Sequence, residues 1–176
     1  MLFIAFPAMS TCKISDCGRY RYTLEQVMEP ELPLRQIMWI GLHPSPVDDV
    51  NRDPTLRRIE AFSSRLGYTA FVVTNLFALR TLRPLELVTA EDPIGPENDA
   101  VLRAVAKSSH GIVACWGSNG SLQRRDDRVT EMLRNTTSKP LQSLSRNGDG
   151  SPKHPLYVRW DTVLTAYPWQ TKSNVA

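Results

Sequence analysis

Two of the three histidines in this chain of 176 residues stand directly before a proline. His43 lies in "GLHPSPVDD" and His154 in "SPKHPLYV", each next to an apolar stretch that is typical of an extended strand. An imidazole changes its charge near neutral pH, so histidine suits acid–base chemistry there. A histidine before a proline also has a purely structural interpretation, because proline favours extended geometry in the residue before it.

Two other side chains with useful chemistry end apolar runs. Asn75 ends "YTAFVVTN" and Trp116 ends "GIVACW". An amide both donates and accepts hydrogen bonds, so Asn75 is suited to reading the edge of a polar ligand. Taken singly, Asn75 is explained by turn geometry and Trp116 by the core. Their joint position at predicted strand ends favours a binding site.

The segments that carry these residues alternate between strand-like and helix-like patterns. Buried strands are predicted near 36–42, 68–75, 111–116 and 141–145, and helices near 54–66, 97–108 and 124–134. This alternation predicts an α/β fold, a three-layer sandwich with a central, mainly parallel, four-stranded sheet. Ligands bind at the carboxyl ends of such strands, so His43, Asn75 and His154 should meet in one crevice.

The length suits a single α/β domain over 1–170, in which 1–35 adds a strand or an edge hairpin. The irregular stretch 78–96 is long for a connection in a compact domain, and we expect it to border the crevice. The polar end, 171–176, is predicted to be a frayed tail.

The composition narrows the class of protein. The net charge of +3, from 21 basic and 18 acidic residues, permits contact with phosphate but does not demand it. Three cysteines without a CxxC pair fit a reducing compartment, and the paired spacings of a zinc site are missing, so we expect no metal and no cofactor. No apolar run reaches membrane-spanning length, and the apolar start lacks the basic region of a signal peptide. We therefore expect a cytoplasmic protein.

A series of motifs between Cys12 and Trp160 resembles one known family. These motifs are "CGRYRYTL", "GLHPSPVDD", "VVTNLFALR", "DPIGPEND", "VACWGSNG" and "GSPKHPLYV", in this order. Together they resemble the bacterial and phage family catalogued as domain of unknown function 1643, a resemblance that brings no function. The family usually has asparagine where this chain has His43, and "TAD" where it has "PVD".

A fainter resemblance, to the uracil-DNA glycosylases, does bring chemistry. Those enzymes have a G-x-(D/N)-P turn after the first core strand, a strand that ends in a base-reading asparagine, a strand that ends in "WG", and a late "HPSP"-type loop. Gly41–Pro44, Asn75, Trp116-Gly117 and His154-Pro155 look like these four elements, in the same order. The resemblance implies a glycosylase-like sandwich and is an analogy at the level of the fold.

This analogy implies a role for each residue. His43 would activate water for attack on an N-glycosidic bond, and His154 would donate a hydrogen bond to the departing base. Asn75 would read the edge of the base. The contacts to substrate would come from Asn75, the turn residues Pro44 and Ser45, the wall residue Trp116, and Arg80 as a phosphate contact.

Other charged residues have simpler interpretations. Asp53 is favoured as a helix cap and Asp92 as a turn residue, while Asp48 and Asp49 are candidate carboxylates. Arg57 and Arg58 are candidate phosphate contacts, although a solvated helix face explains both.

Three functions stay open on the sequence. The first is a glycosylase-like hydrolase that acts on a nucleotide or nucleic acid. The second is a non-catalytic module that binds such a ligand, and the third is a protein-interaction domain in which the histidines are structural. A basic rim around the crevice would favour the first two, and a dry apolar patch the third.

Overall fold

A computed structural model describes residues 9–45 and 53–168 as one mixed sheet with helices on both faces. The strands are β1 (Met9–Ile14), β2 (Arg21–Val27), β3 (Gln36–Gly41), β4 (Ala70–Asn75), β5 (Gly111–Ala114), β6 (Leu141–Ser143) and β7 (Thr165–Ala166). The α-helices are α1 (Pro54–Arg65), α2 (Glu86–Thr89), α3 (Asn98–Ser108) and α4 (Arg125–Arg134), and η1 (Ser118–Arg124) and η2 (Pro155–Tyr157) are 3₁₀ turns. Asp48, Asp49 and the predicted tail 171–176 lie outside the described residues.

The strand order across the sheet is β1-β2-β4-β3-β5-β6-β7. The neighbours β4, β3, β5 and β6 run parallel, which confirms the α/β class and the predicted parallel strands. The prediction of a four-stranded sheet is wrong, because antiparallel pairing adds β2 and β1 at one edge and β7 at the other. A glycosylase-type sandwich is not confirmed.

β1 and β2 form an antiparallel hairpin at one edge of the sheet, as predicted for part of 1–35, and β2 lies between β1 and β4. Its residues from Arg21 to Leu24 are all buried. β7 has only two residues, too few for a recognisable pattern of alternation.

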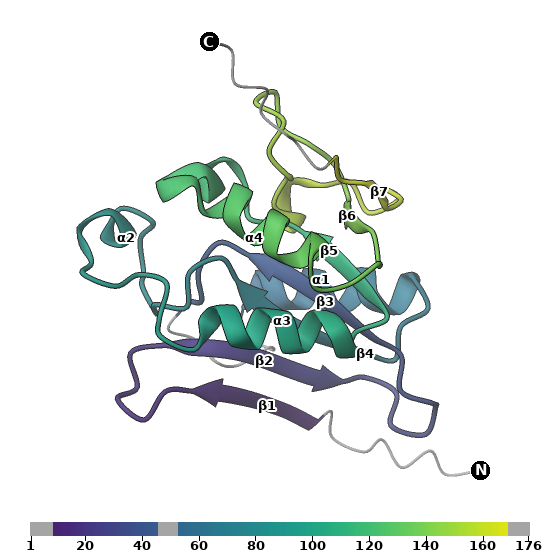
Figure 1. Cartoon of the computed structure of the whole chain (residues 1–176). Coiled ribbons are helices and arrows are strands. Elements are labelled where there is room, and N and C mark those ends of the chain that lie inside the picture. The colour runs from purple at the N-terminus through teal and green to yellow at the C-terminus, as the bar shows by residue number, and fades with distance from the viewer. Residues whose placement is uncertain (1–8, 46–52, 169–176) are drawn as a thin grey trace.

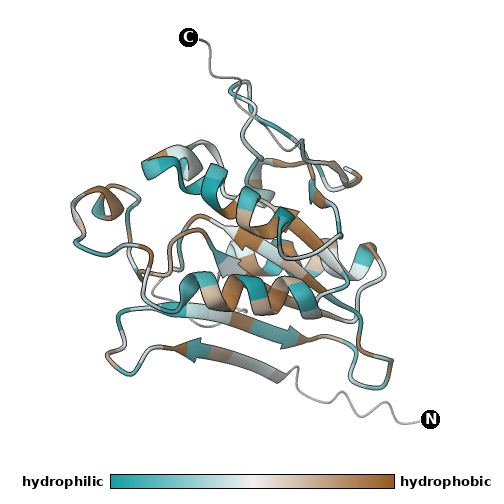
Figure 2. Cartoon of the chain, viewed as in Figure 1, coloured by the Kyte–Doolittle hydropathy of each residue, from teal (hydrophilic) through white to brown (hydrophobic). Residues whose placement is uncertain are grey.

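Side chains of the parallel strands point alternately to two cores on opposite faces of the sheet. Met38 and Ile40 of β3 join the core under α3 and α4, whereas Ile37 and Trp39 join the core under α1. In Figure 1, α3 and α4 lie in front of the sheet and α1 behind it. Burial on both faces explains why these strands are continuously apolar, as the brown strands in Figure 2 show.

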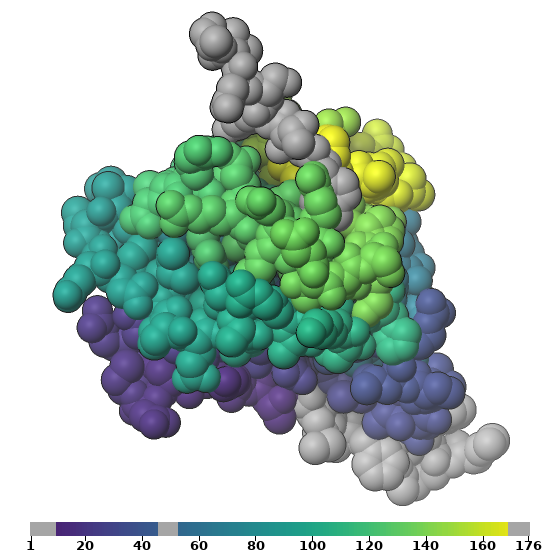
Figure 3. Space-filling model, viewed as in Figure 1, coloured from purple at the N-terminus to yellow at the C-terminus, as the bar shows by residue number. Residues whose placement is uncertain are grey.

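The helices that cover the sheet match the predicted ones closely. Asp53 caps α1 by accepting hydrogen bonds from the backbone N–H groups of Thr55 and Leu56, at 2.7 and 3.3 Å, and Gly67 adopts a left-handed conformation just after the helix. α3 and α4 turn polar sides to solvent and cover the near face in Figure 3. No helix in the described parts of the chain has the length and apolar character needed to cross a membrane.

Candidate active site

A cavity of about 610 Å³ opens at the carboxyl ends of the parallel strands. The ends of β3, β4 and β5 contribute to it, together with the start of α1 and the loop between β6 and β7. His43, Asn75 and His154 all line this cavity, as do Ser45 and Trp116. The predicted convergence of these five residues is therefore present, while the roles assigned to them stay predictions.

The irregular stretch 78–96 borders the cavity through Thr81, Leu82 and Pro84. Asp92 shapes this stretch, since its carboxylate accepts from the backbone N–H groups of Ile94 and Gly95 at 3.1 and 2.9 Å. The interpretation of Asp92 as a turn residue is thus confirmed.

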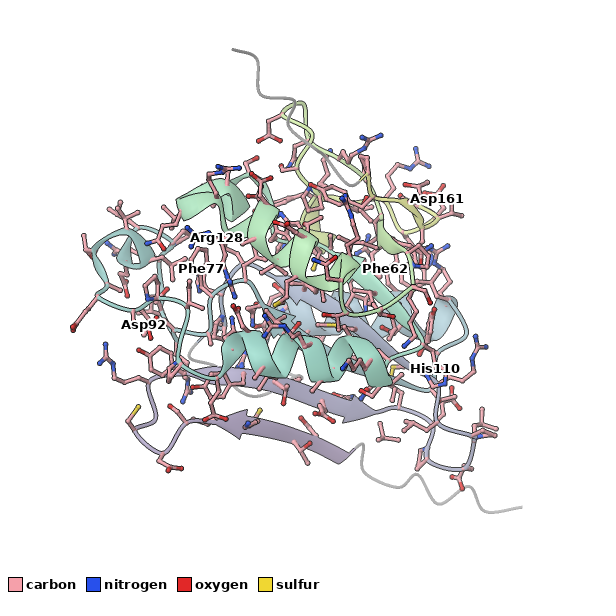
Figure 4. All side chains as sticks on the ribbon, viewed as in Figure 1. Phe62, Phe77, Asp92, His110, Arg128 and Asp161 are labelled. Atoms are coloured by element: carbon pink, nitrogen blue, oxygen red, sulfur yellow. The ribbon has the colours of Figure 1, made fainter. Side chains whose placement is uncertain are left out.

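Pro44 and Arg80, two predicted contacts, do not line the cavity. Pro44 is buried, and its carbonyl accepts from the backbone N–H of Thr81 at 3.3 Å, which ties the turn after β3 to the 78–96 stretch. The guanidinium of Arg80 donates to the carbonyl of Gly18 at 3.4 Å, in the turn between β1 and β2. The third histidine, His110, precedes β5 at the opposite end of the sheet and is labelled in Figure 4.

The hydrogen bonds of His43 determine which ring nitrogen carries the proton. Nδ1 lies 3.3 Å from both the Pro44 carbonyl and the Thr81 hydroxyl. The hydroxyl itself donates to the carbonyl of Arg83 at 3.1 Å, so both neighbours of Nδ1 are acceptors. Nδ1 is therefore protonated in the neutral ring, and Nε2 is an acceptor without a hydrogen-bond partner in residues 9–45 and 53–168.

The surroundings of His43 keep its ring neutral. Burial is the main cause that lowers its pKa below the ordinary value, and the nearby charge of Arg21 lowers it further. The Pro44 carbonyl and the charge of Glu86 act in the opposite direction but do not reverse the shift. A neutral imidazole with a bare Nε2 is able to accept a proton.

His154 has the opposite arrangement. Its Nδ1 accepts from the backbone N–H of Leu156 at 3.4 Å, at the start of η2, so Nε2 carries the proton in the neutral ring. Burial lowers the pKa of His154, against the raising effect of the Asp53 carboxylate. The cavity is thus lined by one imidazole that presents an acceptor and one that presents a donor.

Asn75 brings an unpartnered amide to the same cavity. The residue is only 4% exposed, yet its side-chain amide makes no hydrogen bond to any residue that the structure describes. Its position requires Gly41 on the neighbouring strand, because a Cβ atom at Gly41 would lie 2.6 Å from Oδ1 of Asn75. A buried amide that faces a cavity has a donor and an acceptor available for a ligand.

Two buried side chains hold the end of β4 in place. Nδ2 of Asn98, at the start of α3, donates to the carbonyls of Asn75 and Leu76 at 3.1 and 3.0 Å. Nε of Arg125, at the start of α4, donates to the same Leu76 carbonyl at 2.8 Å, and this arginine pairs with Asp99 of α3. Helices α3 and α4 thereby fix the backbone that carries Asn75.

The end of β5 forms another wall. Trp116 is 2% exposed, and its ring lies edge-on to Tyr167 with 5.7 Å between centroids. A Cβ at Gly120 would come within 2.1 Å of the indole, so glycine is needed there. Burial raises the pKa of Cys115 to about 12, and its thiol donates to the Ile40 carbonyl at 3.3 Å, which makes it a structural group and not a nucleophile.

Several cavity residues were not anticipated from the sequence. Arg21 of β2 is 3% exposed, and Asp53 lines the cavity as well as capping α1. The other polar ones lie in helical turns or loops, namely Thr55 of α1, Ser118 and Asn119 of η1, Tyr157 of η2, and Thr81 and Asn147 of loops. No local pattern in the sequence identifies these residues as part of the cavity. Because buried arginines are rare, Arg21 could have been identified as a candidate site residue once its strand was placed inside the sheet.

The described lining of the cavity is close to neutral. Arg21 carries the positive charge there and Asp53 the negative one, while both lining histidines have lowered pKa values. Among the described residues, no three His, Cys, Asp or Glu side chains are grouped so that they could hold a metal ion. Such a lining suits a neutral polar group with donors and acceptors.

Comparison with known proteins places the chain in a family without assigning an activity. The family model described as "Protein of unknown function (DUF1643)" matches residues 21–156. No curated protein and no solved structure gave a match, so these comparisons do not support the resemblance to uracil-DNA glycosylases. Because the matched segment contains β2 to β6 together with His43, Asn75 and His154, and covers well over half of the sequence, the chain belongs to the DUF1643 family.

Proposed function

We propose that this protein is a glycosylase-like hydrolase that cleaves an N-glycosidic bond in a nucleotide or nucleic acid. One observation carries the proposal. An imidazole acceptor on His43, an imidazole donor on His154 and the unpartnered amide of Asn75 line a single cavity, whose described lining is nearly neutral.

In this mechanism a water molecule attacks the anomeric carbon of the sugar. Nε2 of His43 accepts a proton from that water, and the oxygen of the water forms the new bond to carbon. The carbon–nitrogen bond breaks, and its electron pair leaves with the base. Nε2–H of His154 donates a hydrogen bond to the base where negative charge develops. The base anion takes up a proton from solvent and His43 releases its proton to solvent, so that the products are the free base and a sugar that carries a hydroxyl group in its place.

Asn75 provides recognition in this proposal. Its amide offers one acceptor and two donor hydrogens, which match the alternating carbonyl and N–H groups on the edge of a base. Asn98 donates to the carbonyl of Asn75 and Arg125 to that of Leu76, so the backbone that carries the amide is held in place. The cavity volume lies within the range typical of small-molecule sites.

The alternative is a non-catalytic module that binds the same ligands, and one observation favours it. The groups that orient His43 are a carbonyl and a hydroxyl, and no carboxylate bonds to its ring among the described residues. An imidazolium formed at His43 would therefore lack the carboxylate partner that stabilises the histidine of catalytic triads. A cytoplasmic location fits both functions and stays an expectation.

The test combines ligand binding with product analysis. Nucleobases, nucleosides and nucleotides are screened by thermal shift, and chromatography then measures base release from those that bind. We expect binding by the parent protein, weaker binding by Asn75→Ala, and normal binding without release by His43→Ala. His110→Ala is the matched control, because this histidine lies outside the cavity. Binding without base release by the parent would favour the non-catalytic module, and absence of binding would refute both functions.

A further inference from the structure

A patch of arginine and aromatic side chains adjoins the mouth of the cavity. It consists of the outer side of α1 and the segment 155–162, and is called here the α1 patch. Tyr157 lines the cavity and yet is 76% exposed, so it stands at the rim. Trp160, three residues further on, is 47% exposed.

Two aromatic rings of the patch, those of Phe62 and Trp160, lie against arginines. Trp160 packs against the buried Phe62 of α1, with 5.7 Å between ring centroids. The guanidinium groups of Arg58 and Arg65 both lie against these two rings, at 4.9 to 5.5 Å from the centroids. The same arginines donate to backbone carbonyls of Val158 and Thr162, which fastens the segment to α1.

Positive charge prevails on this patch. Arg57 is exposed in the first turn of α1, beside Leu56 of the cavity wall, and its guanidinium forms no ion pair with any side chain in the described part of the chain. Arg159 is exposed as well, but pairs with Asp161 through two hydrogen bonds of 3.1 and 2.9 Å. Against the carboxylates of Asp53 and Glu60 on the same helix, Arg57, Arg58 and Arg65 leave a net charge of +1 next to two exposed aromatic rings.

We infer that the α1 patch binds a single strand of nucleic acid, so that the ligand of the cavity is a nucleotide within a strand. This inference rests on the proposed function. Arginines attract phosphates, and exposed aromatic rings stack on bases of any sequence. The base that enters the cavity leaves its neighbours unstacked, and Tyr157 and Trp160 offer them surfaces at the rim and beyond it.

The experiment compares a labelled dT12 oligonucleotide with thymidine monophosphate. We expect dT12 to bind the parent protein at least about tenfold more tightly, with an affinity that falls as salt is added. Tyr157→Ala and Trp160→Ala should each weaken binding of dT12 by roughly 5- to 150-fold, which is the effect of losing one stacked base. Trp160→Ala should leave binding of the monophosphate nearly unchanged.

Two charge variants distinguish binding of dT12 by the α1 patch from nonspecific attraction of DNA to a basic protein. Arg57→Ser should reduce the slope of log affinity against log salt by about 0.7, the value for one lost contact to a single-strand phosphate. The control is Arg128→Ser, an exposed arginine of α4, on the other face of the sheet (Figure 4), which should not change the slope. Arg57 needs no repacking when replaced, so this variant remains informative if Trp160→Ala does not fold.

The outcomes separate the two proposals. Equal affinities for dT12 and the monophosphate, or equal effects of Arg57→Ser and Arg128→Ser, would overturn the α1 patch and leave the proposed function standing. Binding of dT12 that depends on the patch, without base release or occupation of the cavity, would keep the patch and refute the hydrolase. Tighter binding of duplex than of dT12 would also contradict a single-strand surface.

Discussion

His43 and His154 differ in the protonation of the ring nitrogen that faces away from the backbone, which is Nε2 in both, and this difference sets their expected roles. In both rings Nδ1 makes the backbone contact, as a donor in His43 and as an acceptor in His154. The free Nε2 is consequently an acceptor in His43 and a donor in His154. A proline after each histidine holds the backbone that makes these contacts.

At the scale of single residues, the exchange of His43 is the most informative. His43→Ala should lower base release by about a hundred- to ten-thousand-fold with little change in ligand binding, because a general base acts on the transition state. His43→Asn introduces the residue that is usual at this position in the family, and should keep the fold and alter only the rate of base release. Rates and dissociation constants of both variants check this. An unfolded His43→Asn variant, or an alanine variant with parental activity, would make His43 a structural residue.

The convergence could be predicted because His43 and Asn75 follow or end apolar runs and His154 lies in the loop after the fourth predicted strand, and parallel strands bring such ends together. The state of each ring could not be predicted, since it depends on Thr81 and Leu156, whose positions are set by loops. Arg21 was missed for a similar reason. Its burial depends on antiparallel pairing of β2 with β4, which no local pattern specifies.

At the scale of elements, the contact between β3 and β4 positions the amide of Asn75. The two strands pair in register so that Gly41 lies opposite Asn75, and the side chain of Asn75 lies across the space that a Cβ would take. The apolar runs predicted β3, β4 and β5 well, because burial on both faces leaves an unmistakable pattern. The close approach of one side chain to one glycine carries no such signal.

Gly41→Ala should therefore damage both stability and recognition. The new methyl group would need Asn75 to move, at a cost of about 1–3 kcal/mol for overpacking. We expect a lower free energy of unfolding and weaker binding of nucleotides, measured by urea denaturation and titration. Gly148→Ala is the control, because a Cβ there meets no atom within 4 Å. Equal behaviour of the two variants would show that Asn75 needs no support from β3.

At the scale of the whole molecule, buried ionisable groups on both sides of neutrality define a range of pH in which the fold is most stable. Burial lowers the pKa values of His43 and His154 below their ordinary value of 6.5. It raises the pKa of Cys115 from 9.0, and that of Tyr167 from 10.0, to about 12 in each case. All four groups are thus held neutral in the folded state.

Linkage between proton binding and folding gives the sign of each effect. Below about pH 6.5 the unfolded chain binds protons at both histidines before the folded protein does, so stability falls as the pH is lowered. Above about pH 9 the unfolded chain loses protons from Cys115, and then from Tyr167, before the folded protein does, so stability falls as the pH is raised. The stability conferred by these groups is complete between those limits.

We therefore expect the melting temperature to be highest between about pH 6.5 and 9 and to decrease on both sides. The double variant His43→Asn with His154→Asn should flatten the acidic decrease, because asparagine does not bind protons in this range. Cys115→Ala should flatten the alkaline decrease and lower the melting temperature at every pH, since it leaves a gap in the core under α1. Melting curves from pH 5 to 10.5 measure both effects. An acidic decrease that persists unchanged in the double variant would mean that the two cavity histidines are not the groups that resist protonation, and would also remove the basis for a neutral His43 as the proton acceptor.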